Sequence, residues 1–218
     1  MRFGRLTWSF VLAAVPVAVA GCQLPGLVSN LGYAIEKEKK IEVLAQYPGL
    51  ENQTVAIVVQ ADMSTLYDSP MVVPNVTANL GVRLQSNVPG IKVRDAREVM
   101  AWQYHTPGWS TMPYGDIARE LDVSRVLIVD LYEFRLNPPG NRWTWDGVCA
   151  ANVGVIERDG IDPDAFAETF NIVVRFPPQE LGRDSATAGQ IETGLIVKFI
   201  EKTAWLFYKH IEQKYPDG

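Results

Sequence analysis

Residues 116–129 read Asp-Ile-Ala-Arg-Glu-Leu-Asp-Val-Ser-Arg-Val-Leu-Ile-Val. Ile117, Ala118 and Leu121 recur at helical spacing, which predicts that Tyr114–Leu121 is a short helix with one apolar side. The run Arg125–Phe134 that follows is rich in Val, Ile and Leu, and it predicts a strand. A helix that leads directly into an apolar strand is typical of an α/β domain.

The segments before this stretch also alternate between strand and helix signals. Thr54–Gln60 is a β-branched and almost continuously apolar run, as expected of a central strand that is covered on both faces. Residues 68–70 (Asp-Ser-Pro) offer a cap and a starter proline for a helix that runs to about Asn87. A brief strand is expected at Ile91–Arg94, and Asp95 then caps another helix.

The segments after it predict two antiparallel strands and a long helix. The strands are expected at Arg142–Ile156 and Thr169–Phe176, and the two prolines at 177–178 are expected to end the second of them. Ala186–Gln213 carries apolar residues at helical spacing, which predicts an amphipathic helix long enough to cover a sheet. The predicted fold class is α/β (α+β): a mixed sheet of about five strands in the order β-α-β-α-β-β-β-α, with the C-terminal helix packed on it.

The first 22 residues have the layout of a secretion signal. Arg2 and Arg5 precede an apolar stretch at 6–20, and small residues precede Cys22. The apolar stretch is shorter than the roughly 18 residues that a transmembrane helix requires. The tetrapeptide Val19-Ala20-Gly21-Cys22 resembles the lipobox of bacterial lipoproteins.

The lipobox resemblance implies cleavage between Gly21 and Cys22 and a lipid on Cys22 that anchors the chain to a membrane. More than one acyl chain makes such anchoring stable. In bacterial lipoproteins an Asp directly after the lipidated cysteine signals retention in the inner membrane. Because this chain has Gln23 there, the resemblance implies the outer membrane, with the domain facing the periplasm. An ordinary signal peptide followed by a chance cysteine remains the alternative.

Three segments are therefore expected. Residues 1–21 are a signal peptide that is removed. Residues 22–50 are a lipidated tether, rich in Pro, Gly, Ser and Asn at its start, with a short charged helix within Tyr33–Tyr47. Residues 51–218 are a single periplasmic α/β domain.

Composition excludes several classes of function. The 218 residues are 47% hydrophobic and 21% charged, as in an ordinary globular protein, and the net charge is −5. An acidic chain argues against binding nucleic acid, which needs a basic face. No phosphate-binding glycine motif is present, so no nucleotide is expected. Two cysteines, Cys22 and Cys149, are too few for a disulfide framework. Cys149 is predicted to be a buried core residue. No cofactor and no metal site are predicted.

The pattern Leu-x-Val-x-x-Val-Leu within residues 116–129 is similar to one in the curli-secretion lipoprotein family, in the N-terminal domain of the Tol-Pal translocation protein and in related small envelope lipoproteins of unassigned role. The similarity covers residues 50–213 and carries no functional side chain. It implies a non-enzymatic module that binds a protein partner in the envelope. A subunit of an oligomeric secretion channel is an alternative, although the predicted strands lack the alternation of a transmembrane hairpin.

The candidate partner-binding surface is the aromatic-rich stretch 102–114, because rigid rings bury much area at little entropic cost. Its candidate residues are Trp102, Tyr104, His105, Trp109 and Tyr114. The alternative is that Trp102 and Trp109 simply cover the edge of the core.

A second hypothesis is an envelope hydrolase. Asp62 and Asp68 follow the first strand, where α/β sheets usually bind ligands, and His105 is a possible general base. No nucleophile motif accompanies them, so no catalytic residue is assigned.

Overall fold

The computed structural model describes residues 40–213. The chain divides into a unit of residues 42–212 (with Gly218) and a second unit of residues 1–41 and 213–217, almost all of which is outside the described range. The predicted cleavage site at Gly21 and lipidation site at Cys22 also lie outside it. Within residues 40–213, no helix has the length and apolar character needed to cross a bilayer.

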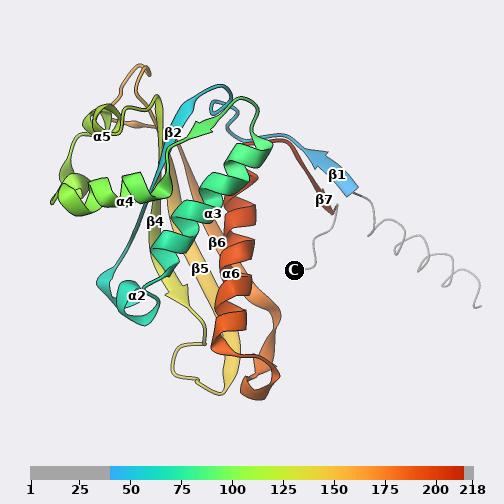
Figure 1. The fold of residues 1–218 in the computed structure, drawn as a ribbon. Coiled ribbons are helices and arrows are strands. Elements are labelled where there is room, and N and C mark those ends of the chain that lie inside the picture. The colour runs from blue at the N-terminus through green and yellow to red at the C-terminus, as the bar shows by residue number, and fades with distance from the viewer. Residues whose placement is uncertain (1–39, 214–218) are drawn as a thin grey trace, which may run out of the picture. The chain divides into compact units, whose positions relative to one another are not determined.

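A five-stranded mixed sheet forms the centre of the larger unit (Figure 1), with the strand order β3-β2-β4-β5-β6. The strands are β2 (Thr54–Ala61), β3 (Lys92–Val93), β4 (Arg125–Arg135), β5 (Thr144–Glu157) and β6 (Phe166–Gly182). Strand β2 runs parallel to both β3 and β4, whereas β5 is antiparallel to β4 and to β6. The predicted fold class is confirmed.

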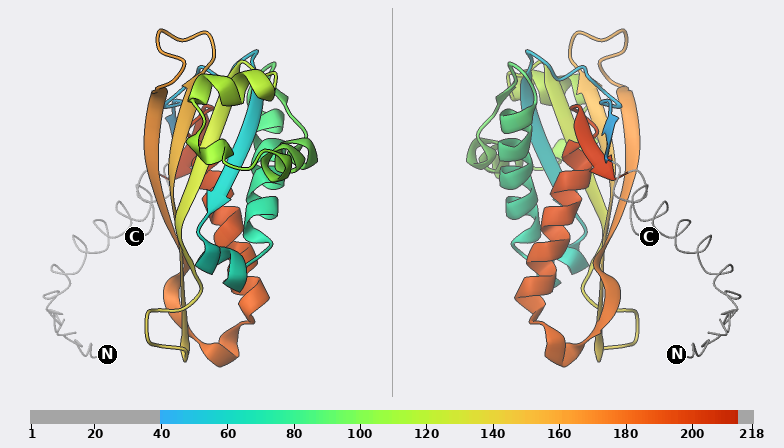
Figure 2. Two further views of the ribbon diagram at one scale, coloured as in Figure 1. Left: turned by 90° about the vertical axis from the view of Figure 1, so that its left-hand side faces the viewer. Right: turned by 90° about the vertical axis from the view of Figure 1, so that its right-hand side faces the viewer.

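Helices cover both faces of this sheet. They are α2 (Met63–Asp68), α3 (Val72–Asn87), α4 (Ala96–His105), α5 (Tyr114–Glu120) and α6 (Ala188–Ala204), with short 3-10 turns η1 (Trp109–Thr111) and η2 (Arg183–Ser185). Helices α3 and α6 lie side by side on one face (Figure 2), and α4 and α5 pack on the other. Helix α2, at the end of β2, was not predicted.

The alternation along β2 explains why its sequence is apolar throughout. Val55, Ile57 and Val59 belong to the core cluster under α3 and α6. Ala56 and Val58 belong to a second cluster, under α4 and α5. Both faces of β2 are therefore buried, and each fully buried Val or Ile side chain contributes about 1.5–3 kcal/mol of hydrophobic free energy.

Polar side chains fix the starts of three helices. Asp62 and Asp95 accept hydrogen bonds from the backbone N–H groups of Thr65 and Arg97, which caps α2 and α4. Thr187 and Gln190 form a capping box at the start of α6, close to the start predicted at Ala186.

The predicted end of the last sheet strand at residues 177–178 is wrong, because β6 continues through both prolines to Gly182. Gly147 of β5 is opposite Phe176, but Trp145 is opposite Leu181, so residues 177–180 form a bulge. A proline cannot donate a ladder hydrogen bond, but an edge strand with a bulge does not need that donor.

The predicted C-terminal helix ends at Ala204, not at Gln213. Leu206, Phe207 and Tyr208 are buried, and His210–Gln213 forms strand β7. Apolar spacing continues past the helix end because these side chains still face the core, although the backbone is no longer helical. Strand β7 pairs with β1 (Lys40–Val43), which takes the place of the predicted helix over residues 40–43; residues 33–39 of that prediction lie outside the described range.

Candidate functional site

Three of the five aromatic candidates lie against the core. The rings of Trp102 and Trp109 are 6.1 Å apart, and Trp102 donates its indole N–H to Glu120 at 2.7 Å. Tyr114 packs on Phe166 with ring centroids 4.5 Å apart. All four rings pack at the edge of the cluster under α4 and α5. Covering the core is therefore part of the role of these rings, and this was the alternative that the sequence left open.

The other two candidates, Tyr104 and His105, project from the last turn of α4. The side chain of Tyr104 is 82% exposed, and that of His105 is also exposed. Their rings meet edge to face, with centroids 5.2 Å apart. An exposed aromatic pair at a helix end offers apolar contact area without disturbing the fold.

A crevice of about 390 Å³ lies at the end of β2 and is lined in part by α4, the helix that carries Tyr104 and His105. Its lining residues come from β2, α2, α3, α4 and η1, and they are Val59, Gln60, Ala61, Leu66, Val73, Met100, Gln103, Trp109 and Ser110. None of them carries a formal charge. The crevice is beyond the carboxyl end of a parallel strand, the usual place for ligands in such sheets.

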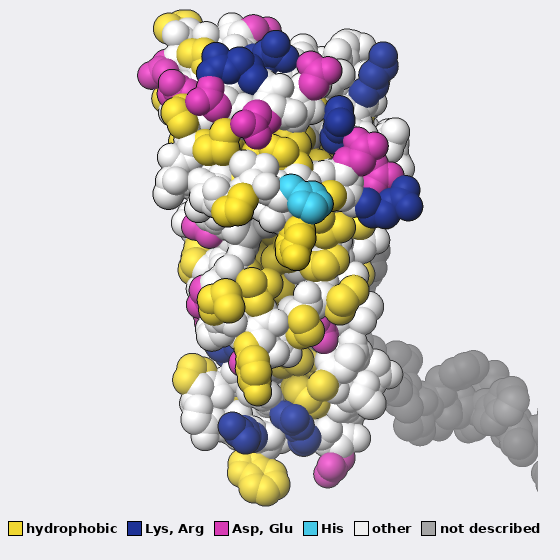
Figure 3. Space-filling view, turned by 60° about the vertical axis from the view of Figure 1, so that its left-hand side comes forward, with side chains coloured by type: hydrophobic (Ala, Val, Ile, Leu, Met, Phe, Trp, Pro, Cys, Tyr) yellow, Lys and Arg dark blue, Asp and Glu magenta, His cyan; other side chains and the backbone are white. Residues whose placement is uncertain are grey.

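More apolar side chains are exposed around the crevice. Met63 and Tyr67 of α2, the helix of the lining residue Leu66, are 81% and 88% exposed. Figure 3 shows hydrophobic side chains gathered along the middle of this side of the molecule, while charged side chains lie mostly toward its two ends. We call the crevice together with Met63, Tyr67 and Tyr104 the apolar face. Single exposed hydrophobic residues are ordinary, but a gathering of them marks an interaction surface.

The sequence did not reveal the α2 part of this face. Asp62 was interpreted as a possible ligand-binding carboxylate, whereas in Asp62-Met63-Ser64-Thr65 it serves as a helix cap. An Asp directly before a run of helix-compatible residues is an N-cap signal in the sequence, and it could have placed Met63, Leu66 and Tyr67 on one short helix.

The hydrolase candidates are not joined to one another. Asp62 accepts hydrogen bonds from the Thr65 backbone N–H at 2.7 Å and from the Ser64 hydroxyl at 3.1 Å. These bonds to Thr65 and Ser64 lower the pKa of Asp62, which makes the carboxylate a weaker base. Among residues 40–213, no hydrogen bond or ion pair links any two of Asp62, Asp68 and His105.

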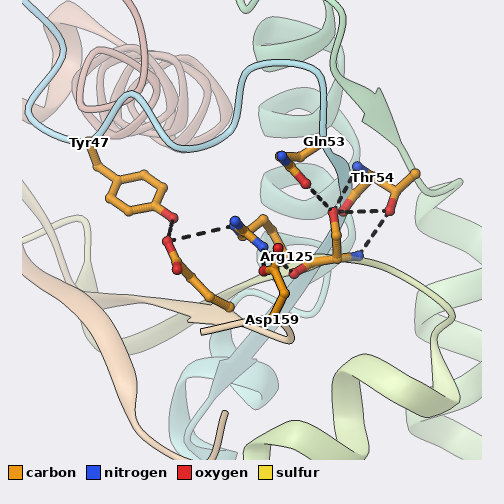
Figure 4. Close-up of polar contacts among 7 residues, drawn as sticks. Tyr47, Gln53, Thr54, Arg125 and Asp159 are labelled. Atoms are coloured by element: carbon orange, nitrogen blue, oxygen red, sulfur yellow. Dashed lines mark hydrogen bonds and ion pairs between the residues drawn. The ribbon is translucent and has the colours of Figure 1, made fainter. Parts of the chain in front are cut away.

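A polar cluster lies at the opposite end of β2 (Figure 4). Arg125, whose side chain is only 9% exposed, pairs with Asp159 and approaches Glu157 at 3.7 Å. Tyr47 donates its hydroxyl to Glu157. Burial of the phenol, followed by the bond to Glu157, raises the pKa of Tyr47, whereas the bond to Arg125 lowers the pKa of Asp159. We call these four residues the Arg125 cluster.

The Arg125 cluster fastens the segment before β2 to the sheet. Next to it, Ser124 accepts a bond from the Thr54 backbone N–H and donates to Gln53 at 2.7 Å. Tyr47 also packs edge to face on Phe207, 6.2 Å away. Because its charged groups are paired with one another, the cluster has a structural role rather than a free group for chemistry.

A larger groove, of about 720 Å³, runs between α3 and α6. Val82 and Val197 are exposed there, but Asn75 and Asn79 and the ion pair of Arg83 with Glu201, at 3.4 Å, also line it. What distinguishes this groove from the crevice at β2 is charge: Arg83, Glu192 and Glu201 line the groove, whereas no charged residue lines the crevice.

No protein-family model matches the chain, and no curated protein is similar to it in sequence. Solved structures with a similar arrangement include the PelC dodecamer from Paraburkholderia phytofirmans, at 12% identity over 78% of this chain and 97% of that one, with a TM-score of 0.43. Lipoprotein GNA1162 from Neisseria meningitidis is 12% identical over 69% of this chain and 97% of that one (TM-score 0.44). The LpoB C-terminal domain from Salmonella enterica is 15% identical over 59% and 87% (TM-score 0.33). Bacterial lipoproteins are thus among the solved structures whose fold this chain resembles.

Proposed function

We propose that this chain is a lipid-anchored envelope module that binds a protein partner and catalyses no reaction. Its binding surface is the apolar face. The observation that carries the proposal is the uncharged crevice at β2 with exposed aromatic and methionine side chains around it.

The anchor rests on the sequence. The basic start, the apolar stretch and the lipobox ending at Cys22 favour export and lipidation, and Gln23 favours the outer membrane. A lipid on Cys22 would hold the domain beside the bilayer, where the apolar face can meet envelope proteins.

The chemistry of the apolar face suits a protein partner. Binding energy at interfaces is concentrated in a few aromatic anchors. Trp109 lines the crevice, and the exposed Tyr104 and Tyr67 follow the lining residues Gln103 and Leu66 in sequence. Methionine side chains such as those of Met63 and Met100 adapt their shape to an incoming surface. The lack of charge in the crevice means that a docking apolar segment desolvates no buried ion.

Photo-crosslinking in the cell tests the binding surface. A photoreactive benzoylphenylalanine at Tyr104 should crosslink to one envelope protein, and the adduct should weaken at least tenfold when Trp109→Ala is added. The same probe at Lys202, on α6 and exposed, is the matched control and should give no such adduct. Equal adducts from both positions would refute the surface, and adducts between two copies of this chain would favour the oligomeric channel instead.

The anchor has its own test. Labelled palmitate should enter the wild-type chain and be absent from Cys22→Ala, and the wild-type chain should sediment with outer membranes. Incorporation that persists in Cys22→Ala would contradict lipidation at this residue.

A further inference from the structure

Most of the outer edge of β2 has no strand beside it. Strand β3 is aligned only with Thr54 and Val55. The carbonyls of Gln53 and Val55 accept hydrogen bonds from the backbone of Lys92 and Arg94, each at 2.8 Å. Because backbone groups alternate in direction along a strand, the N–H and C=O groups of Val59 and Ala61 point toward this same edge, away from β4.

One of these edge groups is bonded to a side chain instead of a strand. Gln103, near the end of α4, donates its side-chain amide to the Val59 carbonyl at 3.1 Å. A primary amide has the same kinds of donor and acceptor as a peptide group. Gln103 therefore occupies the position that the peptide group of a neighbouring strand would take.

The crevice lies along this edge and has a wall on each side of the sheet. Val73 packs with the core cluster under α3 and α6, whereas Trp109 packs with the cluster under α4 and α5. A strand laid here would direct successive side chains alternately to the two walls. Because both walls are apolar and no lining residue is charged, the segment that fits is apolar on both sides and uncharged.

We infer that the apolar face takes its partner by strand addition: an extended, uncharged segment of the partner protein pairs with the β2 edge at Val59–Ala61 and displaces Gln103. This inference rests on the proposed function and specifies how the surface binds. Main-chain hydrogen bonds hold the segment, and the two apolar walls select its side chains. Three consecutive β2 residues line the crevice and span about 10 Å, so the added strand is short.

A peptide of defined sequence tests the mode of binding. The probe is a fluorescein-labelled peptide of alternating valine and alanine, five residues long and so apolar on both sides, with a lysine outside each end of that stretch for solubility. Its fluorescence anisotropy is measured with the full lipidated chain in detergent micelles. The comparison peptide has the same side chains but is N-methylated at all five central residues, which removes its backbone donors and leaves its apolar groups.

The expected results separate backbone pairing from simple apolar contact. The parent peptide binds, and N-methylation weakens binding at least tenfold. Gln103→Ala strengthens binding about fivefold, because a competing hydrogen bond is lost, and Trp109→Ala weakens it at least tenfold. Val82→Ala, on the exposed side of α3, is the matched control and leaves binding unchanged; micelle uptake of the peptide is the same for every variant.

Strand addition is overturned if the two peptides bind equally well. It is also overturned if the parent peptide binds neither the wild type nor Gln103→Ala. If the crosslink from position 104 is nevertheless lost in Trp109→Ala, the apolar face remains the binding surface and only the mode is wrong. If that crosslink is also absent in the wild type, the proposed function fails as well.

Discussion

Replacing Arg125 by methionine tests whether the Arg125 cluster fastens the segment before β2 to the sheet. Methionine keeps the unbranched apolar stem of the side chain but removes the guanidinium group and its charge. Three oxygens then lose a partner: the Ser124 carbonyl, bonded at 2.9 Å, and the carboxylates of Glu157 and Asp159.

The magnitude follows from the exposure of each partner. Asp159 is 69% exposed, so its ion pair with Arg125 contributes at most about 1 kcal/mol to the free energy of unfolding. The part-buried Ser124 carbonyl loses a hydrogen bond from a charged donor, and such bonds contribute about 1.5–3 kcal/mol. Glu157 is only 27% exposed, but it loses an ion pair at 3.7 Å and no hydrogen bond. Because Glu157 keeps its bond from Tyr47, we expect Arg125→Met to lower the free energy of unfolding by about 2 kcal/mol. For a domain of this size, that corresponds to a fall in Tm of about 4–8 °C.

Thermal unfolding followed by circular dichroism is the assay, with Arg158→Met as the matched control. Arg158 is 47% exposed and pairs with Asp122 at 3.6 Å on the surface, so its replacement should change stability by less than about 0.5 kcal/mol. A Tm for Arg125→Met within 1 °C of that for Arg158→Met would refute the fastening role.

Three further predictions concern the rest of the domain. The pKa of Tyr47 is raised in the folded state, so its phenol contributes stability below the ordinary phenol pKa near 10, and this contribution is lost as the pH rises above 10. Between pH 9 and 11 the Tm of the wild type should therefore fall more steeply than the Tm of Tyr47→Phe. Parallel plots of Tm against pH would count against a buried phenol. Burial raises the pKa of the Cys149 thiol, so iodoacetamide at pH 8 should label Cys149 only in urea, and fast labelling of the folded chain would place that thiol at the surface. Thr187→Ala removes the capping box of α6 and should lower the free energy of unfolding by about 1 kcal/mol, or the Tm by about 2–4 °C. Ser185→Ala, at an exposed position, is the control and should have little effect. Equal Tm values for the two variants would show that the cap does not stabilise α6.

Local patterns predicted the order of the sheet and its helices well. The apolar run at β2 and the Asp95 cap of α4 are local signals, and the structure uses each of them as expected. The errors occur where distant parts of the chain decide the outcome. The β5–β6 register places the prolines at 177–178 in a bulge, and core contacts keep Phe207 buried after α6 has ended.

The candidate site was predicted only in part. The aromatic stretch was recognised, but its sequence does not show that Trp102 packs on the core while Tyr104 faces outward. The crevice itself is formed by β2, α2, α3, α4 and η1 together, so it depends on tertiary contacts. Likewise, nothing local indicates that Gln103 reaches the backbone of Val59, because the two residues are distant in sequence and adjacent only in the fold.

Mass spectrometry of the crosslinked peptides tests the central claim most directly. Benzoylphenylalanine is placed at Tyr104 of α4 and, separately, at Tyr67 of α2, next in sequence to the lining residues Gln103 and Leu66. We predict that both positions attach to the same uncharged segment of one periplasm-facing protein. Adducts scattered over many proteins, at the yield found from Lys202, would contradict the claim that the apolar face is a binding surface.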